Sequence, residues 1–217
     1  MSQKIKKSGC LLFVLIGSCL SITAVTLLTQ IWILPSQANV TTTLTQMYED
    51  DQAIRASGLD SPANLARFLL GDWIRVNKTR RIVDADLLTT AEDYANAARI
   101  LQHGNRAEDY LTAQNLSLTA YDLGDLSMLR HSALAEDRYL IAIGKPQKYG
   151  TQFKCSGDDG WQLSPIDPAI SDDGRRQMDI EPLAELDAKM IELNEATNAT
   201  CTLDSDTMRL VETIMGE

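Results

Sequence analysis

The chain has 217 residues, of which 44% are hydrophobic and 23% are charged, as in an ordinary globular domain with or without a tail. Its formal net charge of -10 argues against a nucleic-acid surface, because binding to phosphates requires clustered lysine and arginine. The three lysines Lys4, Lys6 and Lys7 are the only charges before Glu49, so the remainder is more acidic still.

The N-terminal region carries an export signal. Residues 9–34 contain no charge and follow the basic stretch Lys4–Lys7. This run is longer than a signal-peptide core of about 7–15 residues and long enough for a spanning helix of about 20. Three interpretations stay open: an uncleaved anchor with its N-terminus inside, a signal peptide cleaved near Ala38, and a lipoprotein signal ending at Cys19. All three place residues 39–217 outside the cytoplasm, as an inner-membrane, periplasmic or secreted domain, and the first makes the membrane a partner through residues 9–34.

Four cysteines divide into two pairs. Cys10 and Cys19 lie in the apolar segment, whereas Cys155 and Cys201 lie in the remainder of the chain. In an oxidising compartment the second pair is expected to form a disulfide. The alternative is two free, buried thiols.

Two helices are predicted before residue 85. The first begins after Thr41–Thr43, carries an apolar side that includes Leu44 and Ile54, and ends near Gly58. The second begins at Ser61-Pro62, a cap followed by proline in the first turn. Its apolar residues recur at helical spacing and are expected in the core: Leu65, Phe68, Leu69, Trp73 and Val76.

Three further helices form the centre of the prediction. The first opens with the capping-box residues Thr90–Asp93 and ends at Gly104. The second, capped by Asn105 and Glu108, ends at Gly124, and the third runs from Asp125 to Gly144. Loops of two or three residues make consecutive helices antiparallel neighbours.

The chain changes character after Gly150. Two short strands are predicted within about 151–166, on either side of a glycine- and aspartate-rich turn. Helices follow within about 181–215. The fold is therefore expected to be mainly α, an antiparallel helical bundle with a small β-hairpin after the third core helix, preceded by an N-terminal apolar helix.

Standard catalytic and metal motifs are missing from the sequence. It contains no H-E-x-x-H or C-x-x-C pair and only two histidines, which argues against a zinc site. It also lacks a G-x-S-x-G elbow, a P-loop and a dinucleotide fingerprint. We therefore expect neither a metal nor a cofactor.

His103 is the first candidate for a catalytic residue. It lies at a predicted helix C-terminus, where the helix dipole favours its protonated form. A hydrolase would use it with Asp93 or Asp137, and the structural alternative is that it caps backbone carbonyls. Arg138 either forms a buried ion pair with Asp137 or presents its guanidinium to an anionic ligand.

The segment G-K-P-Q-K-Y-G-T-Q at residues 144–152 supplies the other candidates. Gln147, Tyr149 and Gln152 offer side-chain hydrogen bonds near the end of a helix. They either fasten the hairpin to the bundle or bind a ligand.

Three motifs resemble an uncharacterised bacterial family that is often found in exported proteins. They are D-x-x-N-A-A-R-I-L-Q-H-G at residues 93–104, E-D-Y-L-x-A at 108–113 and D-R-Y-L-x-x-x-G-K-P-Q-x-Y-G-T-Q at 137–152. The resemblance covers roughly residues 50–194, with a weaker upstream match at Asp51-Gln52 and Arg55. It implies a bacterial source but brings no activity that could be transferred to this chain.

Two hypotheses result. The first is a non-enzymatic extracytoplasmic helical domain that binds a small ligand or a protein. The second is a hydrolase built on His103.

Overall fold

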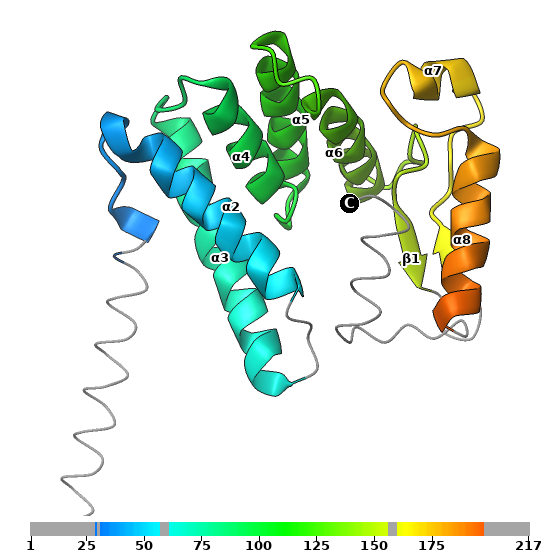
Figure 1. The fold of residues 1–217 in the computed structure, drawn as a ribbon, viewed down its shortest axis with the longest axis horizontal. Coiled ribbons are helices and arrows are strands. Elements are labelled where there is room, and N and C mark those ends of the chain that lie inside the picture. Colours follow the sequence, from blue (N-terminus) through cyan, green and yellow to red (C-terminus); the bar gives the residue numbers. More distant parts are fainter. Residues whose placement is uncertain (1–28, 30, 57–60, 156–159, 198–217) are drawn as a thin grey trace, which may run out of the picture.

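A computed structural model of the chain describes residues 29, 31–56, 61–155 and 160–197, without the side chain of Cys155. Within these ranges the chain is mainly α and forms a helical bundle with a two-stranded antiparallel hairpin, as predicted (Figure 1). A short 3-10 helix, η1 (Gln37–Asn39), precedes the bundle. The elements that follow are α2 (Val40–Ala56), α3 (Pro62–Asp84), α4 (Ala91–Leu101), α5 (Ala107–Asp122), α6 (Met128–Ala142), β1 (Phe153–Cys155), β2 (Trp161–Leu163), α7 (Asp172–Arg176) and α8 (Leu183–Thr197).

Side-chain caps define the helix starts. The Thr90 hydroxyl accepts a hydrogen bond from the Asp93 backbone at 3.1 Å, and the Asp93 carboxylate accepts one from the Thr90 backbone at 2.9 Å. This is the predicted capping box. Helix α5 differs from the prediction by one position, because the Asp109 carboxylate accepts from the Arg106 backbone at 3.0 Å.

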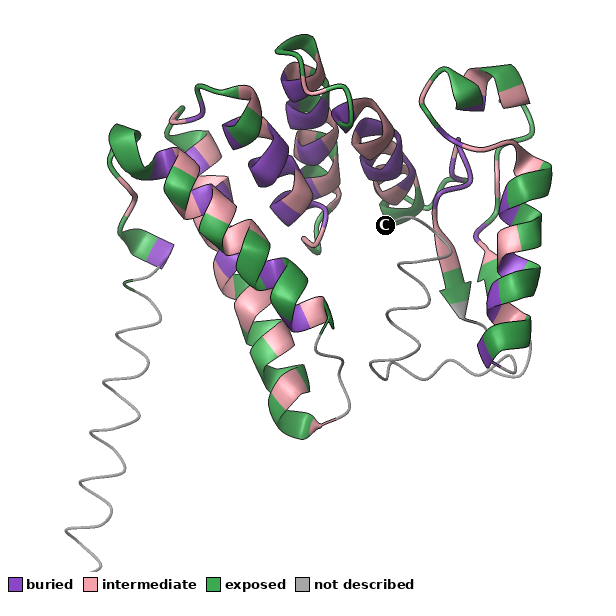
Figure 2. Ribbon diagram, viewed as in Figure 1, coloured by how far each residue is buried: buried purple, intermediate pink, exposed green. Residues whose placement is uncertain are grey.

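The main core lies between α2, α3, α4, α5 and α6. Helix α5 packs against both α4 and α6, and α2 packs against α3 and α4. Small side chains on the facing surfaces let the helices approach closely, and the purple stripes of Figure 2 mark these buried surfaces. The fully buried alanines are Ala95, Ala97, Ala98, Ala113, Ala120, Ala133 and Ala135.

A second, smaller core joins the hairpin and α8 to α6. It contains Leu134 from α6, Tyr149 from the loop, and Ile180 and Leu186 from the C-terminal part. The strand register pairs Phe153 with Leu163 and Cys155 with Trp161. Helix α8 is fastened to β2 because the Asn194 amide bonds both the backbone N–H and the carbonyl of Trp161, at 2.7 and 2.8 Å.

The prediction that the apolar stripe of α3 lies in the core is wrong for most of its length. Leu65, Leu69 and Trp73 are 42%, 58% and 49% exposed, whereas Val76 is buried. Figure 1 shows the reason: the N-terminal half of α3 projects beyond α4 and lies beside α2 alone among the described elements. Helical spacing identified an apolar side of this helix, but no described element covers it.

Several predictions fall outside the described residues. They concern most of the apolar segment 9–34, the turn at 156–159, the C-terminal segment 198–217 and the Cys155–Cys201 disulfide. Within the described ranges, no helix is both long enough and apolar enough to span a membrane.

Candidate functional site

Asp137 organises the loop that follows α6. Its carboxylate is fully buried and accepts hydrogen bonds from the backbone N–H groups of Lys148, Tyr149 and Thr151 at 2.6, 2.9 and 3.0 Å. The Thr151 hydroxyl adds a fourth donor at 2.9 Å. A buried carboxylate is stable when several donors satisfy it, and here those donors all belong to one loop.

Gln147 closes the same loop from the other side. Its amide nitrogen donates to the carbonyls of Gln152 and Ser164, both at 2.8 Å, and its amide oxygen accepts from the Gln152 backbone at 2.7 Å. The Tyr149 ring lies in the second core, and the Gln152 amide donates to the Thr151 hydroxyl at 3.0 Å. Segment 144–152 therefore fastens the hairpin to α6.

Asp93 and His103 lie at opposite ends of α4. The Asp93 carboxylate accepts from the hydroxyl of Thr41 at 2.6 Å and from the backbone N–H groups of Thr89 and Thr90. Burial opposes its charge, but these hydrogen bonds prevail and lower the Asp93 pKa. Ten residues of helix separate the two side chains by about 15 Å. The structure thus brings neither Asp93 nor the loop-bound Asp137 to His103.

The carboxylate that does meet His103 is Asp51. This residue of α2 is 2% exposed, and its Oδ2 atom lies 3.4 Å from His103 Nε2. Burial, with the positive charge of Arg55, lowers the pKa of His103 to about 3, although the charge of Asp51 opposes both. The imidazole is therefore neutral at neutral pH.

Asp51 belongs to a network of two carboxylates and two guanidinium groups. Arg55 donates to Asp51 Oδ2 at 2.8 Å and to Asp72 Oδ2 at 3.1 Å. Arg75 contacts Asp72 Oδ1 at 2.5 Å and Asp51 Oδ1 at 3.1 Å. The network ties α2, α3 and the end of α4 together at His103.

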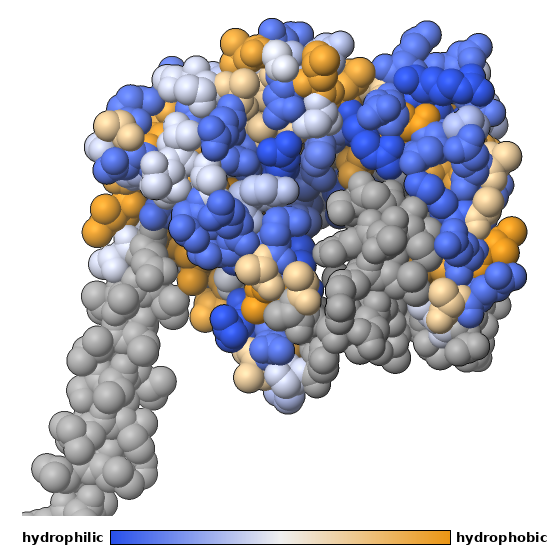
Figure 3. Space-filling view, viewed as in Figure 1, coloured by the Kyte–Doolittle hydropathy of each residue, from blue (hydrophilic) through white to orange (hydrophobic). Residues whose placement is uncertain are grey.

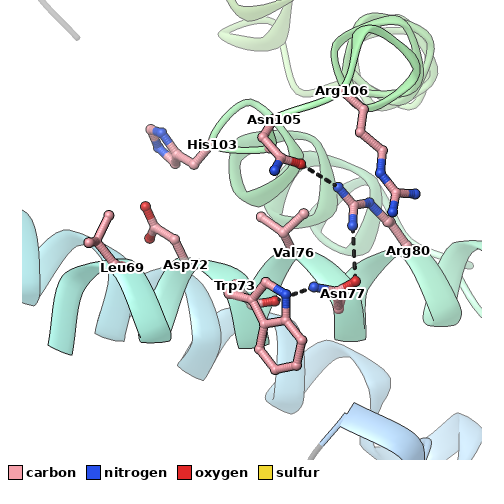
Figure 4. Close-up of a pocket in the computed structure, with 10 residues that line it drawn as sticks. Leu69, Asp72, Trp73, Val76, Asn77, Arg80, His103, Asn105 and Arg106 are labelled. Atoms are coloured by element: carbon pink, nitrogen blue, oxygen red, sulfur yellow. Dashed lines mark hydrogen bonds between the residues drawn. The ribbon is translucent and has the colours of Figure 1, made fainter. Parts of the chain in front are cut away.

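His103 lies between two cavities. The first, here called the α3 cavity, has a volume of about 330 Å³ and lies between α3 and the α4–α5 turn. Figure 4 shows Asp72 and His103 at one end of it, Trp73 below the middle, and Arg80 and Arg106 at the other end. Its lining residues are Leu69, Asp72, Trp73, Val76, Asn77, Arg80, His103, Gly104, Asn105 and Arg106.

The second cavity, here called the arginine cleft, has a volume of about 370 Å³ and lies between α2, α4 and α6. Three arginines and both histidines line it, and none of the described lining residues carries a carboxylate. Such a lining is unexpected in a chain with a net charge of -10. The lining residues are Tyr48, Gln52, Arg99, Gln102, His103, Ser127, Arg130, His131, Leu134 and Arg138.

Arg99 is held in the cleft by long contacts. Its guanidinium donates to Asn96 Oδ1 at 3.3 Å and to Ser127 Oγ at 3.4 Å, and lies 3.7 Å from Asp125 Oδ2. The guanidinium carbon lies 5.3 Å from the centre of the Tyr48 ring. These contacts orient the group without giving it a short charge-assisted hydrogen bond, whose usual length is about 2.7–2.9 Å.

The opposite wall of the cleft comes from α6. Arg130 donates to the Asp179 carbonyl at 2.7 Å and to Glu181 Oε2 at 2.9 Å. The Nδ1 atom of His131 lies 3.2 Å from the Ser127 carbonyl. Burial lowers the His131 pKa, and the charges of Arg99 and Arg130 lower it further. Arg138, a predicted ligand-binding residue, lies on this wall.

Most of the residues that define both cavities were missed by sequence reasoning. Asp51 and Arg55 entered only through the weaker part of the family resemblance, Arg99 only as one position of its motif at residues 93–104, and Asp72 and Arg130 through none of it. In comparisons with family models, with curated proteins and with solved structures, nothing matches this chain.

Proposed function

We propose that the chain is an extracytoplasmic helical binding module whose arginine cleft takes a small anionic ligand. The observation that carries the proposal is the cleft itself: three guanidinium groups and two imidazoles, without a carboxylate among the described lining residues, in an acidic protein. Its volume of about 370 Å³ lies within the range of about 300–1,000 Å³ that is usual for small-molecule sites.

The geometry of Arg99 supports an anionic ligand. A planar guanidinium fork matches the two oxygens of a carboxylate or phosphate, and such pairs are shorter and stronger than neutral hydrogen bonds. A ligand oxygen about 2.8 Å from the Arg99 guanidinium would replace its present contacts of 3.3 to 3.7 Å with protein oxygens. Because the Tyr48 ring already orients the guanidinium, little side-chain entropy remains to be lost on binding.

Binding to this cleft would take up protons. The pKa of His103 is about 3 and that of His131 is also lowered, so both are neutral at pH 7. An anion beside them favours their charged forms and raises both pKa values. Affinity for an anion is therefore expected to increase as the pH falls from 7 to 5.

Isothermal titration calorimetry of the purified chain tests the proposal. The probes are sulfate, inorganic phosphate and citrate at low ionic strength, and sulfate keeps its charge between pH 5 and 7. Arg99→Gln is expected to weaken binding at least tenfold, about 1.4 kcal/mol, and Arg99→Lys by less, because the charge stays while the fork is lost.

The matched control is Arg176→Gln. It removes the same charge from an exposed side chain on α7 that pairs only locally with Asp173 among the described contacts. Binding that falls equally in Arg176→Gln, or that is absent for all three probes at millimolar concentration, would contradict the proposal.

The extracytoplasmic location rests on the basic and apolar N-terminal sequence. N-terminal mass analysis of protein from host membranes and periplasm separates an anchor, which retains residue 1 or 2, from a signal peptide cleaved after Ala38. Thiol labelling with and without reductant tests the Cys155–Cys201 disulfide. Detection of the domain only in the cytosol would exclude export.

A hydrolase is the second candidate, and one observation supports it. His103 lines both cavities and faces a buried carboxylate, Asp51, as a catalytic imidazole would. A pKa of about 3 makes this imidazole a weak base at neutral pH, which is why binding is the preferred function. Hydrolysis of a phosphate or carboxylate ester that His103→Gln abolishes, with folding intact, would reverse that preference.

A further inference from the structure

One face of α3, which no described element covers, has the residue spacing on which a second helix can pack, and we call it the seam. Ala63, Ala66, Leu70, Trp73 and Asn77 follow one another at intervals of three, four, three and four residues. That spacing forms one stripe along a helix and is the pattern on which a second helix packs. Leu70 and Trp73 are 44% and 49% exposed, and Ala63 and Ala66 are exposed as well.

The seam opens into the α3 cavity. Trp73 belongs to both, and Leu69 and Val76 complete an apolar wall of the cavity. Figure 4 shows the Trp73 ring at its edge, below Val76. Helix-in-groove complexes are fastened by a large apolar side chain that enters such a pocket. In Figure 3 the visible surface is mostly hydrophilic, and hydrophobic side chains interrupt it in separate patches, including around the α2–α3 pair.

The charge around the seam is opposite to that of the protein. Helix α3 contains five lysines and arginines and two aspartates, in a chain with a net charge of -10. Arg75 and Arg80 are engaged with Asp72 and Asp109, and the Arg81 guanidinium lies over the Trp32 ring. The exposed Arg67 and the half-buried Lys78 remain along one flank of the seam, and the exposed Arg106 lies at the rim of the cavity.

This charge argues against a second copy of the chain as the occupant. In an antiparallel two-fold pair of α3 helices, Arg67 of each copy would lie near Lys78 of the other. Like charges facing each other across a helix pair are destabilising. A helix with acidic residues beside its apolar stripe would instead meet opposite charges.

We propose that this face of α3 is a docking groove for an acidic amphipathic helix of a partner polypeptide, with one large apolar side chain of that helix in the α3 cavity. The proposal does not depend on the arginine cleft. The partner's apolar residues follow a three-four spacing, and its Asp or Glu side chains pair with Arg67, Lys78 and Arg106.

Site-specific photocrosslinking of the full chain in its host tests this inference. A photoreactive amino acid replaces Leu70, and the control replaces Ile191, which is 60% exposed on α8. Mass spectrometry then identifies the crosslinked peptide. The expected product at residue 70 is a net acidic segment of another polypeptide with apolar residues three and four apart, at least tenfold above the control.

Variants connect that product to the groove. Arg67→Glu combined with Lys78→Glu is expected to reduce the crosslink at least tenfold, and so is Trp73→Ala, while circular dichroism shows an unchanged fold. A crosslink to a second copy, to residues 198–217 of the same chain, to lipid or to a neutral or basic segment would overturn the proposal. So would a yield at residue 70 no higher than at residue 191, or a yield that the charge reversals leave unchanged.

Discussion

The Nε2 atom of His103 lies 3.4 Å from the Oδ2 atom of Asp51, so the end of α4 is joined to the middle of α2. Asp51 in turn forms ion pairs with Arg55 and Arg75, which connects the imidazole to α3. One buried carboxylate thus positions the histidine that lies between the α3 cavity and the arginine cleft. Changes at Asp51 are therefore expected to affect both cavities.

The stability of the protein should depend on pH through His103. Its pKa falls from 6.5 in the unfolded chain to about 3 in the folded one. Between these values the unfolded state binds the proton and the folded state does not, so the stabilisation is fully present above pH 6.5 and is lost as the pH falls toward 3. Lowering the pH from 6.5 to 5 should cost about 2 kcal/mol through this group.

Guanidinium unfolding at pH 5 and pH 7 measures this effect. His103→Gln should make the unfolding free energy less dependent on pH. His131→Gln is the comparison, because the pKa of His131 is lowered as well. Above pH 5 the lowered pKa values of Asp51 and Glu181 contribute little, since both carboxylates remain ionised in the folded and unfolded states. An imidazole that titrates near 6.5 by NMR would contradict the prediction.

Asp137→Asn should loosen the loop after α6. The amide replaces one of two oxygens that together accept from four donors, so a buried N–H group then faces another donor. We expect a loss of about 2–4 kcal/mol in unfolding free energy, measured by urea denaturation. Asp173→Asn, at an 85% exposed side chain, is the control and should change stability by less than about 0.5 kcal/mol.

Gly150→Ala tests the packing of the same loop. Gly150 has a φ of +88°, and an added Cβ would lie 3.1 Å from side-chain atoms of both Ile166 and Leu186. Gly144 also has a positive φ, +74°, but nothing lies within 4 Å of its added Cβ. Gly144→Ala should therefore cost about 1 kcal/mol for backbone strain alone, and Gly150→Ala about 1–2 kcal/mol more. Equal losses in thermal or urea unfolding would show that Ile166 and Leu186 move aside freely.

Arg80→Met should be the most destabilising charge removal on α3. Arg80 holds the buried Asp109 through two hydrogen bonds of 2.6 Å each, and its loss leaves that carboxylate without its cation. Breaking such a pair costs about 3–5 kcal/mol. Arg67→Met, on the exposed face of the same helix, should cost less than about 0.5 kcal/mol by chemical denaturation. If Arg80→Met lowered the unfolding free energy by a similarly small amount, water would be solvating the Asp109 carboxylate in place of Arg80, which would contradict the prediction.

Much of the secondary structure could be predicted from the sequence. Thr90 and Asp93 predict the start of α4, and Ser61-Pro62 predicts the start of α3. Glycines at 104, 124 and 144 follow the ends of α4, α5 and α6. The hairpin was also predicted, near its observed residues 153–163. Helix α7 was not predicted, because its five residues are too few for a periodic pattern to show.

The candidate site was less accessible to the same reasoning. His103 and Arg138 were identified, but their neighbours Asp51, Asp72, Arg99 and Arg130 were not. Asp51 and His103 are 52 positions apart in the chain, and no local pattern connects them. Asp93 and Asp137 were the expected partners of His103, but their carboxylates accept hydrogen bonds elsewhere.

The sequence by itself determined the longer helices, their order and the hairpin, because caps, turns and apolar periodicity act over about four residues. Only the tertiary structure decided which polar side chains meet and which apolar stripe no described element covers. The way the helices pack places Asp51 beside His103. The length of α3 leaves Leu70 and Trp73 exposed. Those relationships depend on contacts between distant segments, and helical periodicity does not encode them.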